Sequence, residues 1–219
     1  MIKIENVNVY GWEAAIRGMR NPLDSWNKSD SCYLTINEIA GHPCDDGLQK
    51  EFVIGENDLQ LMKKLVKAGT DHRKFMRMIT VTMDIVAPMY WWKEFDTYKI
   101  GTVRNSCSTM HTIHKKEFTL DDFSYEHLDL ELNILEVVIT GLNAARKRYL
   151  KSKDKADWWQ MIQLLPSSYN QRSTVQLNYA VLRNIYHSRK NHKLDEWRDF
   201  CKWVEELPYS ELITMEGLE

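Results

Sequence analysis

Hydrophobic and polar residues alternate in some stretches of the chain and recur at helical spacing in others. Alternation is typical of a strand with one buried face, whereas apolar residues three and four positions apart are typical of an amphipathic helix. The predicted elements are strands over residues 2–9 and 78–86, and helices over residues 12–19, 59–68, 90–95, 123–151, 154–164, 178–187 and 194–205. This mixture indicates an α+β, or mixed α/β, fold formed as one domain over residues 1–219.

Residues that cap helix ends support these boundaries. The pair Asp121-Asp122 supplies acceptors ahead of the long predicted helix, and Gly69 stands where a helix C-terminus favours a left-handed residue. Residues 21–55 are rich in Asn, Asp, Ser, Gly and Pro, so we interpret them mostly as loop, with a helical turn at residues 33–39. Residues 99–114 are interpreted as a second, polar loop.

Charge and hydropathy argue against two classes of function. The 219 residues carry 29 Lys and Arg against 31 Asp and Glu, so the chain lacks the basic field that drives sequence-independent nucleic-acid binding. No uncharged apolar stretch approaches the ~20 residues that cross a bilayer, and the N-terminus lacks the pattern of a signal peptide. We therefore expect a cytoplasmic protein that binds neither nucleic acid nor membrane. Eight Trp and ten Tyr indicate a heavy aromatic core, a subunit interface or a stacking surface for a planar ligand.

The polar loop contains candidate metal ligands and a candidate nucleophile. Cys107, His111 and His114 fall within eight residues, but their spacing matches no common zinc framework, so a polar loop is the simpler interpretation. Cys107 is also a candidate nucleophile, because polar residues surround it and His111 lies four residues on. The cysteines lie far apart along the chain, so we expect reduced thiols.

Phosphate recognition has more support in the sequence. Residues 70–74 read Thr-Asp-His-Arg-Lys directly after a predicted helix. Further cations recur in polar contexts at Lys99, Arg104, Arg172, Arg183 and Arg189. Two or three converging arginines form a nucleotide site without a glycine-rich loop, although each cation taken alone is also explained as a surface charge. Neither G-x-G-x-x-G nor G-x-x-x-x-G-K occurs, which disfavours Rossmann and P-loop sites.

A succession of short motifs runs from residue 59 to residue 205. Its first half comprises the segment Leu61–Gly69, the strand that ends at Ala87-Pro88, the aromatic segment Met89–Phe95 and the polar loop. Its second half comprises Leu165-Pro166, Asn178, Leu182, Arg189 and the segment His192–Arg198, which includes Glu196. In order and spacing, this succession resembles the flavin-dependent thymidylate synthases.

The signature loop of that family, R-H-R-x-x-S-x-N-E-x-S-x-R-Y, falls over residues 97–110. Without a gap, Lys99 and Thr102 are the near matches. One inserted residue after Thr102 places Asn105 on the family's Asn and Ser108 on its second Ser. The two leading positions, Arg and His in the family, hold Thr and Tyr in this chain.

The resemblance implies a central antiparallel-rich sheet flanked by long helices, and a homotetramer with sites at subunit junctions. It also implies methylation, or another modification, of the uracil C5 of dUMP, with FAD as cofactor and with NADPH and methylenetetrahydrofolate as co-substrates. The expected cofactor-binding residues are His72, Arg73, Lys99, Thr102, Asn105, Ser108 and Asn178, and the expected substrate-binding residues are Arg104, Ser106, Cys107, Arg172 and Arg189. No catalytic side chain and no metal ligand is assigned.

Two other functions stay open. A non-catalytic homologue that binds pyrimidine nucleotides and has lost its flavin would explain the changed signature loop. A pyrimidine-modifying enzyme that uses Cys107 as nucleophile on C6 would explain the polar residues around the thiol. The first predicts no bound flavin, and the second predicts a perturbed thiol pKa.

Overall fold

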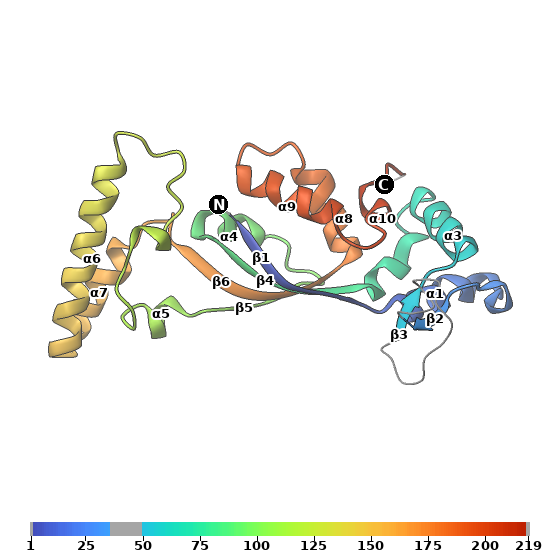
Figure 1. Cartoon of the computed structure of the whole chain (residues 1–219), viewed down its shortest axis with the longest axis horizontal. Coiled ribbons are helices and arrows are strands. Elements are labelled where there is room, and N and C mark those ends of the chain that lie inside the picture. Colours follow the sequence, from blue (N-terminus) through green and yellow to red (C-terminus); the bar gives the residue numbers. More distant parts are fainter. Residues whose placement is uncertain (1, 36–49, 218–219) are drawn as a thin grey trace.

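The centre of the molecule is an antiparallel sheet of four strands. The computed structural model, which describes residues 2–35 and 50–217, orders the strands β1-β4-β6-β5. Their bounds are Lys3–Tyr10 for β1, Thr80–Pro88 for β4, Asn170–Asn178 for β6 and Val103–Ser106 for β5. Helices flank the sheet (Figure 1), so the predicted fold class is confirmed.

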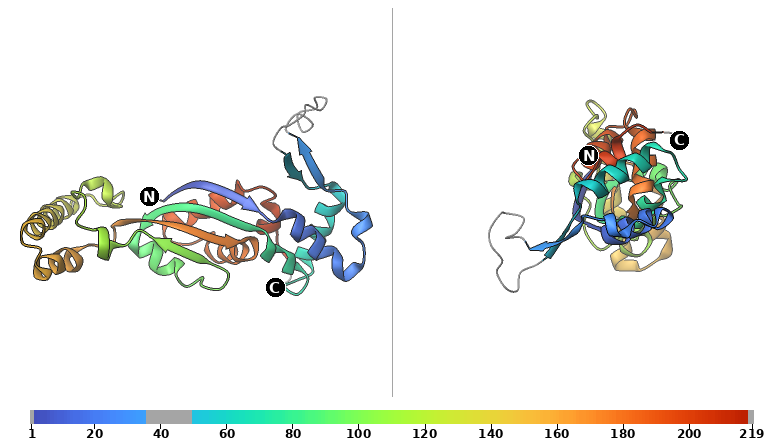
Figure 2. Two further views of the ribbon diagram at one scale, coloured as in Figure 1. Left: turned by 90° about the horizontal axis from the view of Figure 1, so that it is seen from below. Right: turned by 90° about the vertical axis from the view of Figure 1, so that its right-hand side faces the viewer.

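Helices cover one face of this sheet. The covering helices are α4 (Met89–Phe95), α8 (Tyr179–Arg189), α9 (Asp195–Glu205) and α10 (Glu211–Thr214). Alternation along β4 explains this arrangement, because Val81, Met83 and Ile85 are buried in the core while the polar residues between them face away. Seen from the opposite side, the strands lie in front of α8 and α9 (Figure 2, left). We call this opposite side the open face.

An aromatic cluster forms the centre of the main core. The ring centroid of the fully buried Trp91 in α4 lies 4.7 Å from that of Trp197 in α9 and 5.1 Å from that of Phe95. Such ring pairs contribute about 0.5–1.5 kcal/mol each beyond the burial of their area. The Trp91-Trp92 doublet therefore belongs to the core, which is one of the roles expected for the aromatic residues.

A pair of helices projects from one end of the sheet (Figure 1). α6 (Leu132–Ser152) packs on α7 (Lys155–Leu164) around a separate small core that includes Leu142 and Met161. Two large apolar residues of α6 remain exposed, Ile134 at 64% and Val137 at 71%. Among the described residues, neither α6 nor any other helix has the length and apolarity needed to cross a membrane.

The other elements frame the two ends of the sheet. At the end opposite α6 and α7 lie α1 (Trp12–Arg20), η1 (Asn21–Leu23), η2 (Trp26–Lys28), α3 (Glu56–Lys67), η3 (Arg73–Met78) and the hairpin of β2 (Cys32–Thr35) with β3 (Lys50–Val53). α5 (Thr109–Thr112) and η4 (Leu120–Asp122) lie in the segment between β5 and α6. Gly69, with φ of 107°, follows α3 as predicted for a helix C-terminus.

Several sequence-based predictions fail in the polar segments. The pattern does not predict β2, β3, β5 or β6. The helical turn expected at residues 33–39 is wrong where the structure describes it, because residues 33–35 belong to β2, and residues 36–39 lie outside the described ranges. The long helix begins at Leu132 instead of residue 123, because Phe123 has an extended backbone after η4 and pairs with Tyr169 in an isolated β-bridge.

Candidate functional site

The sheet divides the predicted site residues between its two faces. Residues opposite each other on neighbouring strands share a face, and Asn105 lies opposite Thr174, which lies opposite Asp84. Cys107 continues this pairing, since its N–H donates a hydrogen bond to the Arg172 carbonyl over 2.8 Å. Asn105, Cys107 and Arg172 therefore share the open face with Asp84.

Asp84 holds the polar groups of the open face together. Its carboxylate accepts hydrogen bonds from Thr174 Oγ1 (2.6 Å), Arg172 Nη2 (2.7 Å) and Asn6 Nδ2 (2.8 Å). The hydrogen bonds from Thr174 and Arg172 hold the pKa of Asp84 well below its usual range, so this carboxylate is ionised at neutral pH. Arg172 is thereby oriented while 51% of its side chain stays exposed.

A cavity of about 250 Å³ lies beside the open face at the start of β6. Its lining includes Cys107, Arg172, Lys116 and Tyr169. Burial raises the pKa of Tyr169 to about 12, so its hydroxyl stays protonated. Cys107 Sγ lies 3.6 Å from Thr112 Oγ1. This cavity combines a thiol, two cations and a phenol with the carboxylates of Asp121 and Asp122, and Lys116 forms an ion pair with Asp122. The thiol and one of the cations, Arg172, are among the predicted site residues.

A second group of predicted residues surrounds the turn between α4 and β5. Lys99, Thr102 and Arg104 line a cavity of about 230 Å³ there. Gly101 in this turn has φ of +77°, and a Cβ atom on it would lie 3.0 Å from Asn178 Nδ2. The turn therefore packs closely on the N-terminus of α8, which the Asn178 side chain caps. Within the described residues, the buried Thr102 Oγ1 has no hydrogen-bond partner.

Arg104 is held by protein groups on several sides. Its guanidinium carbon lies 3.8 Å from the centroid of the Trp92 ring. Its hydrogen bonds go to Asp96 Oδ1 (2.8 Å), Gln171 Oε1 (2.7 Å) and Ser173 Oγ (3.0 Å). Gln171 Nε2 in turn donates to the Cys107 carbonyl over 2.8 Å. Arg104 thus fastens β5 to β6 and to α4, and its contact with substrate stays a prediction.

Arg189 lies at the C-terminal end of α8, against α4. Its Nε donates to Tyr98 Oη and its Nη1 to Glu94 Oε2, both over 2.9 Å. The same Glu94 oxygen accepts a hydrogen bond of 3.0 Å from Trp197 Nε1, and the Arg189 guanidinium carbon lies 5.0 Å from the Trp197 ring centroid. Glu94 therefore orients Arg189 while 20% of the arginine side chain stays exposed.

The other predicted residues lie apart from these two groups. Arg73 lines a third cavity, between η3 and α8, and the exposed His72 directly precedes η3. Ser106 is exposed at the end of β5, and Ser108 caps α5 by accepting a hydrogen bond from the His111 N–H. The described part of the chain places no three His, Cys, Asp or Glu side chains so that they could hold a metal ion. Six of the twelve predicted site residues line these three cavities, namely Arg73, Lys99, Thr102, Arg104, Cys107 and Arg172.

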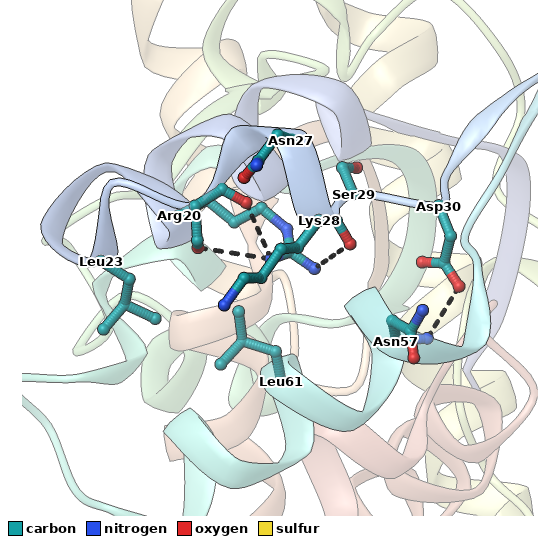
Figure 3. Close-up of a pocket in the computed structure, with 9 residues that line it drawn as sticks. Arg20, Leu23, Asn27, Lys28, Ser29, Asp30, Asn57 and Leu61 are labelled. Carbon is teal, nitrogen blue, oxygen red and sulfur yellow. Dashed lines mark hydrogen bonds between the residues drawn. The ribbon is translucent and has the colours of Figure 1, made fainter.

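A larger cavity, of about 830 Å³, contains none of the predicted residues. Figure 3 shows Arg20, Lys28 and Asp30 among its lining. The Arg20 guanidinium is buried and pairs with Asp58 over 2.6 Å. Burial alone would raise the pKa of Asp58, but hydrogen bonds from Ser29, Ser31 and Arg20 outweigh it and lower the pKa. Since its arginine already has protein partners, we do not assign a ligand to this cavity.

Sequence reasoning missed two charged groups that organise these regions. Asp58 lies on the buried side of α3 with Met62 and Val66, so a carboxylate within an apolar helical stripe was the available signal. Asp84 stands among the polar residues that alternate along β4, which marks a polar sheet face but does not reveal that the Arg172 side chain pairs with it.

Sequence comparisons find no relative of this chain. No protein-family model and no curated protein matches its sequence. Structure comparison gives a different result. The described fold is shared with solved structures of proteins that were crystallised with dUMP or a dUMP analogue.

The flavin-dependent thymidylate synthase ThyX of Helicobacter pylori has this fold. Two of its crystal structures with FAD and dUMP give TM-scores of 0.68 and 0.67 at 15% and 16% identity, and each match covers 99% of this chain and at least 98% of the other. The UMP/dUMP methylase PolB of Streptomyces cacaoi, bound with 5-Br dUMP, gives a TM-score of 0.59 at 13% identity, with 99% and 96% coverage. The TM-scores show a common fold, and at such low sequence identity they show the fold alone.

Proposed function

We propose that the chain is a flavin-dependent enzyme that modifies the uracil C5 of dUMP, as a divergent relative of the flavin-dependent thymidylate synthases. The observation that carries this proposal is the agreement of fold over nearly the whole length of both chains, with proteins that bind the same pyrimidine nucleotide or its analogue. The motif order seen in the sequence agrees with that match. Methylenetetrahydrofolate and NADPH are the proposed co-substrates.

The residues around the α4–β5 turn fit a phosphorylated cofactor. Thr102 Oγ1 is buried without a hydrogen-bond partner among the described residues, and it lines a cavity with the Lys99 ammonium group. A buried hydroxyl without a partner costs free energy, which a ligand oxygen at this position would recover. We assign Lys99, Thr102 and Asn178 to FAD, which supplies hydride-transfer chemistry when it is bound.

Arginines on both sides of the sheet are available for the substrate phosphate. Arg172 is oriented by Asp84 on the open face, and Arg189 is oriented by Glu94 beside α4. Both guanidiniums keep exposed surface, which a phosphate needs in order to form charge-assisted hydrogen bonds with them. Because the two arginines lie on opposite sides of the sheet, a second copy of the chain completes the site in this proposal.

The proposal is tested by purifying the protein and recording its visible absorption spectrum. Bound flavin makes the protein yellow, and dUMP added to it should perturb the flavin spectrum because the two ligands share one site. If the protein is colourless and takes up no added FAD, yet binds dUMP, the proposed enzyme function is wrong. The protein is then the non-catalytic homologue that binds pyrimidine nucleotides.

One observation favours a second candidate, the Cys107-dependent enzyme. The exposed Cys107 thiol shares its cavity with two cations, Arg172 and Lys116, which the sequence did not place near it. This candidate requires that Cys107→Ser abolish turnover, whereas the flavin proposal requires that turnover persist.

A further inference from the structure

Gln171 in β6 links the two groups of predicted site residues. Arg104 lines the cavity beside the α4–β5 turn, which we call the turn cavity, and Cys107 lines the cavity beside the open face, which we call the open-face cavity. Gln171 Oε1 accepts a hydrogen bond from Arg104 Nη2 over 2.7 Å, and Gln171 Nε2 donates to the Cys107 carbonyl over 2.8 Å. One side-chain amide thus connects a residue of each cavity.

The register of β5 on β6 explains why this amide reaches both partners. Arg104 lies opposite the fully buried Val175, and Gln171 lies four positions before Val175 in the same strand, so Arg104 and Gln171 belong to the covered face of the sheet. Cys107 directly follows β5 and belongs to the open face. The Gln171 side chain therefore passes the end of β5 and holds the backbone of a residue whose thiol lies on the other face.

The hydrogen-bonding chemistry of these groups allows one orientation of the amide. A guanidinium group only donates hydrogen bonds, so Arg104 requires the amide oxygen of Gln171. A carbonyl group only accepts, so Cys107 requires the amide nitrogen. Turning the amide over would place donor against donor and acceptor against acceptor. Arg104 therefore fixes the direction of the Gln171 amide, and the amide in turn holds the Cys107 carbonyl.

Both ends of this hydrogen-bond relay are anchored. The Arg104 guanidinium carbon lies 3.8 Å from the centroid of the Trp92 ring, and Trp92 Nε1 donates to the Gln171 carbonyl over 2.9 Å. At the other end, the Cys107 N–H donates to the Arg172 carbonyl over 2.8 Å. Residues of β6 thus hold both backbone polar groups of Cys107, and one side chain passes a displacement of Arg104 to this backbone.

We propose that Gln171 is a positioning residue that couples Arg104 in the turn cavity to Cys107 in the open-face cavity. The inference rests on the proposed function, which assigns the cofactor to the residues of the turn cavity and the substrate phosphate to Arg172 on the open face. It deepens that function by naming the side chain through which the cofactor side of the site sets the geometry of the substrate side. Gln171 performs this role without contacting either ligand.

Two substitutions at Gln171 separate the relay from simple packing. Gln171→Met keeps the length of the side chain and removes both hydrogen bonds. Gln171→Glu keeps an oxygen for Arg104, but its ionised carboxylate cannot donate to the Cys107 carbonyl, so it breaks the second link alone. Gln176→Met is the matched control, because Gln176 is an exposed glutamine of the same strand that is not among the lining residues of either cavity. Circular dichroism checks that each variant folds.

Hydrogen–deuterium exchange of the Cys107 amide, resolved to this residue, tests the relay without any ligand. We expect both Gln171 variants to raise the exchange rate about two- to tenfold, which is the effect of one lost hydrogen bond, and Gln176→Met to change it by less than about twofold. Arg104→Met combined with Gln171→Met should raise the rate by less than the product of the two single effects, because both substitutions act on one relay.

Two results of the exchange measurement would overturn the inference. One is a Cys107 amide that exchanges in Gln171→Glu as it does in the wild type. The other is an effect of Arg104→Met that is equally large with and without Gln171→Met. If Arg104→Met does not fold, the comparison of Gln171→Met and Gln171→Glu with the wild type decides.

Calorimetric titration with dUMP and with FAD tests what the relay does for the site. We expect Gln171→Met to weaken dUMP binding about two- to tenfold. FAD binding should change by less than about twofold, because Asp96 and Ser173 still hold Arg104 in the turn cavity. Faster exchange at Cys107 together with unchanged dUMP affinity would make Gln171 a structural contact alone and would overturn the inference.

These outcomes are separate from those that test the proposed function. If the wild type neither binds nor modifies dUMP, the proposed function fails, and the exchange of the Cys107 amide alone decides on Gln171. If the protein modifies dUMP and both Gln171 variants match the wild type in exchange and in dUMP affinity, the proposed activity stands and the inference about Gln171 fails.

Discussion

Removing the Asp58 carboxylate should destabilise the fold more than any surface substitution. This group is fully buried and receives hydrogen bonds of 2.6 Å each from Arg20 Nε, Ser29 Oγ and Ser31 Oγ. Asp58→Ala leaves the 5%-exposed Arg20 side chain charged without its carboxylate. Breaking a buried ion pair in this way costs about 3–5 kcal/mol. Total stabilities are about 5–15 kcal/mol, so a large share of the free energy of unfolding would be lost.

Thermal unfolding followed by circular dichroism measures this loss. For a chain of this length, about 3–5 kcal/mol corresponds to a Tm lower by roughly 6–20 °C. Asp71→Ala is the control, because the Asp71 carboxylate is 91% exposed and its ion pair with Lys74 is a surface one, expected to contribute less than about 1 kcal/mol. The double variant Arg20→Met with Asp58→Ala should recover part of the loss, since no uncompensated buried charge remains.

The pH dependence of stability follows from the same group. The pKa of Asp58 is lower in the folded state than in the unfolded chain. The stabilisation is therefore present above the unfolded pKa of about 3.9 and is lost as the pH falls through the folded pKa. If Asp58→Ala lowers the Tm by less than about 2 °C at neutral pH, the carboxylate contributes no more to stability than a surface charge. That result would refute the stabilising role assigned to the buried ion pair.

Three further predictions concern the site and the assembly. Arg189→Ala should weaken dUMP binding about ten- to a hundredfold in calorimetry, because a charge-assisted phosphate contact contributes about 1.5–3 kcal/mol; unchanged affinity would contradict the site assignment. Cys107→Ser should keep most nucleotide binding and turnover, and a loss of activity beyond about a thousandfold with binding intact would favour a thiolate mechanism. Light scattering should give a homotetramer, with the exposed Ile134 and Val137 of α6 covered by another copy, and a 25.9 kDa monomer at micromolar concentration would contradict this.

The sequence predicted elements whose burial leaves a periodic signal. β4 alternates between buried and partly exposed residues, and α9 has its buried residues at helical spacing, so both were found. β6 pairs with a strand on each side, yet its sequence gives little hydrophobic signal. Its residues on the open face are polar, and its covered face includes Ser173, so Val175 and Leu177 are the only hydrophobic residues of the strand. The hydrogen bonds of β5 depend on β6, so its polar sequence shows no pattern of its own.

The sequence singles out candidate site residues, whereas the way in which they are held cannot be predicted from it. The sequence singled out Arg172 and Arg189 as cations in polar contexts, and the structure orients each with an acid. The partner of Arg172 lies 88 positions away and that of Arg189 lies 95 positions away, so neither pair can be derived from local spacing. The third cavity could not be predicted for the same reason, because its walls come from η3 and from α8, which lie far apart along the sequence.

Release of tritium from dUMP labelled at C5 tests the central claim most directly, because modification at this carbon expels its hydrogen. The purified protein is incubated with labelled dUMP, FAD, NADPH and methylenetetrahydrofolate. We predict that tritium appears in water at a rate that depends on the flavin, and that this release persists in the Cys107→Ser variant. Binding of labelled dUMP with no tritium release in the complete mixture would contradict it.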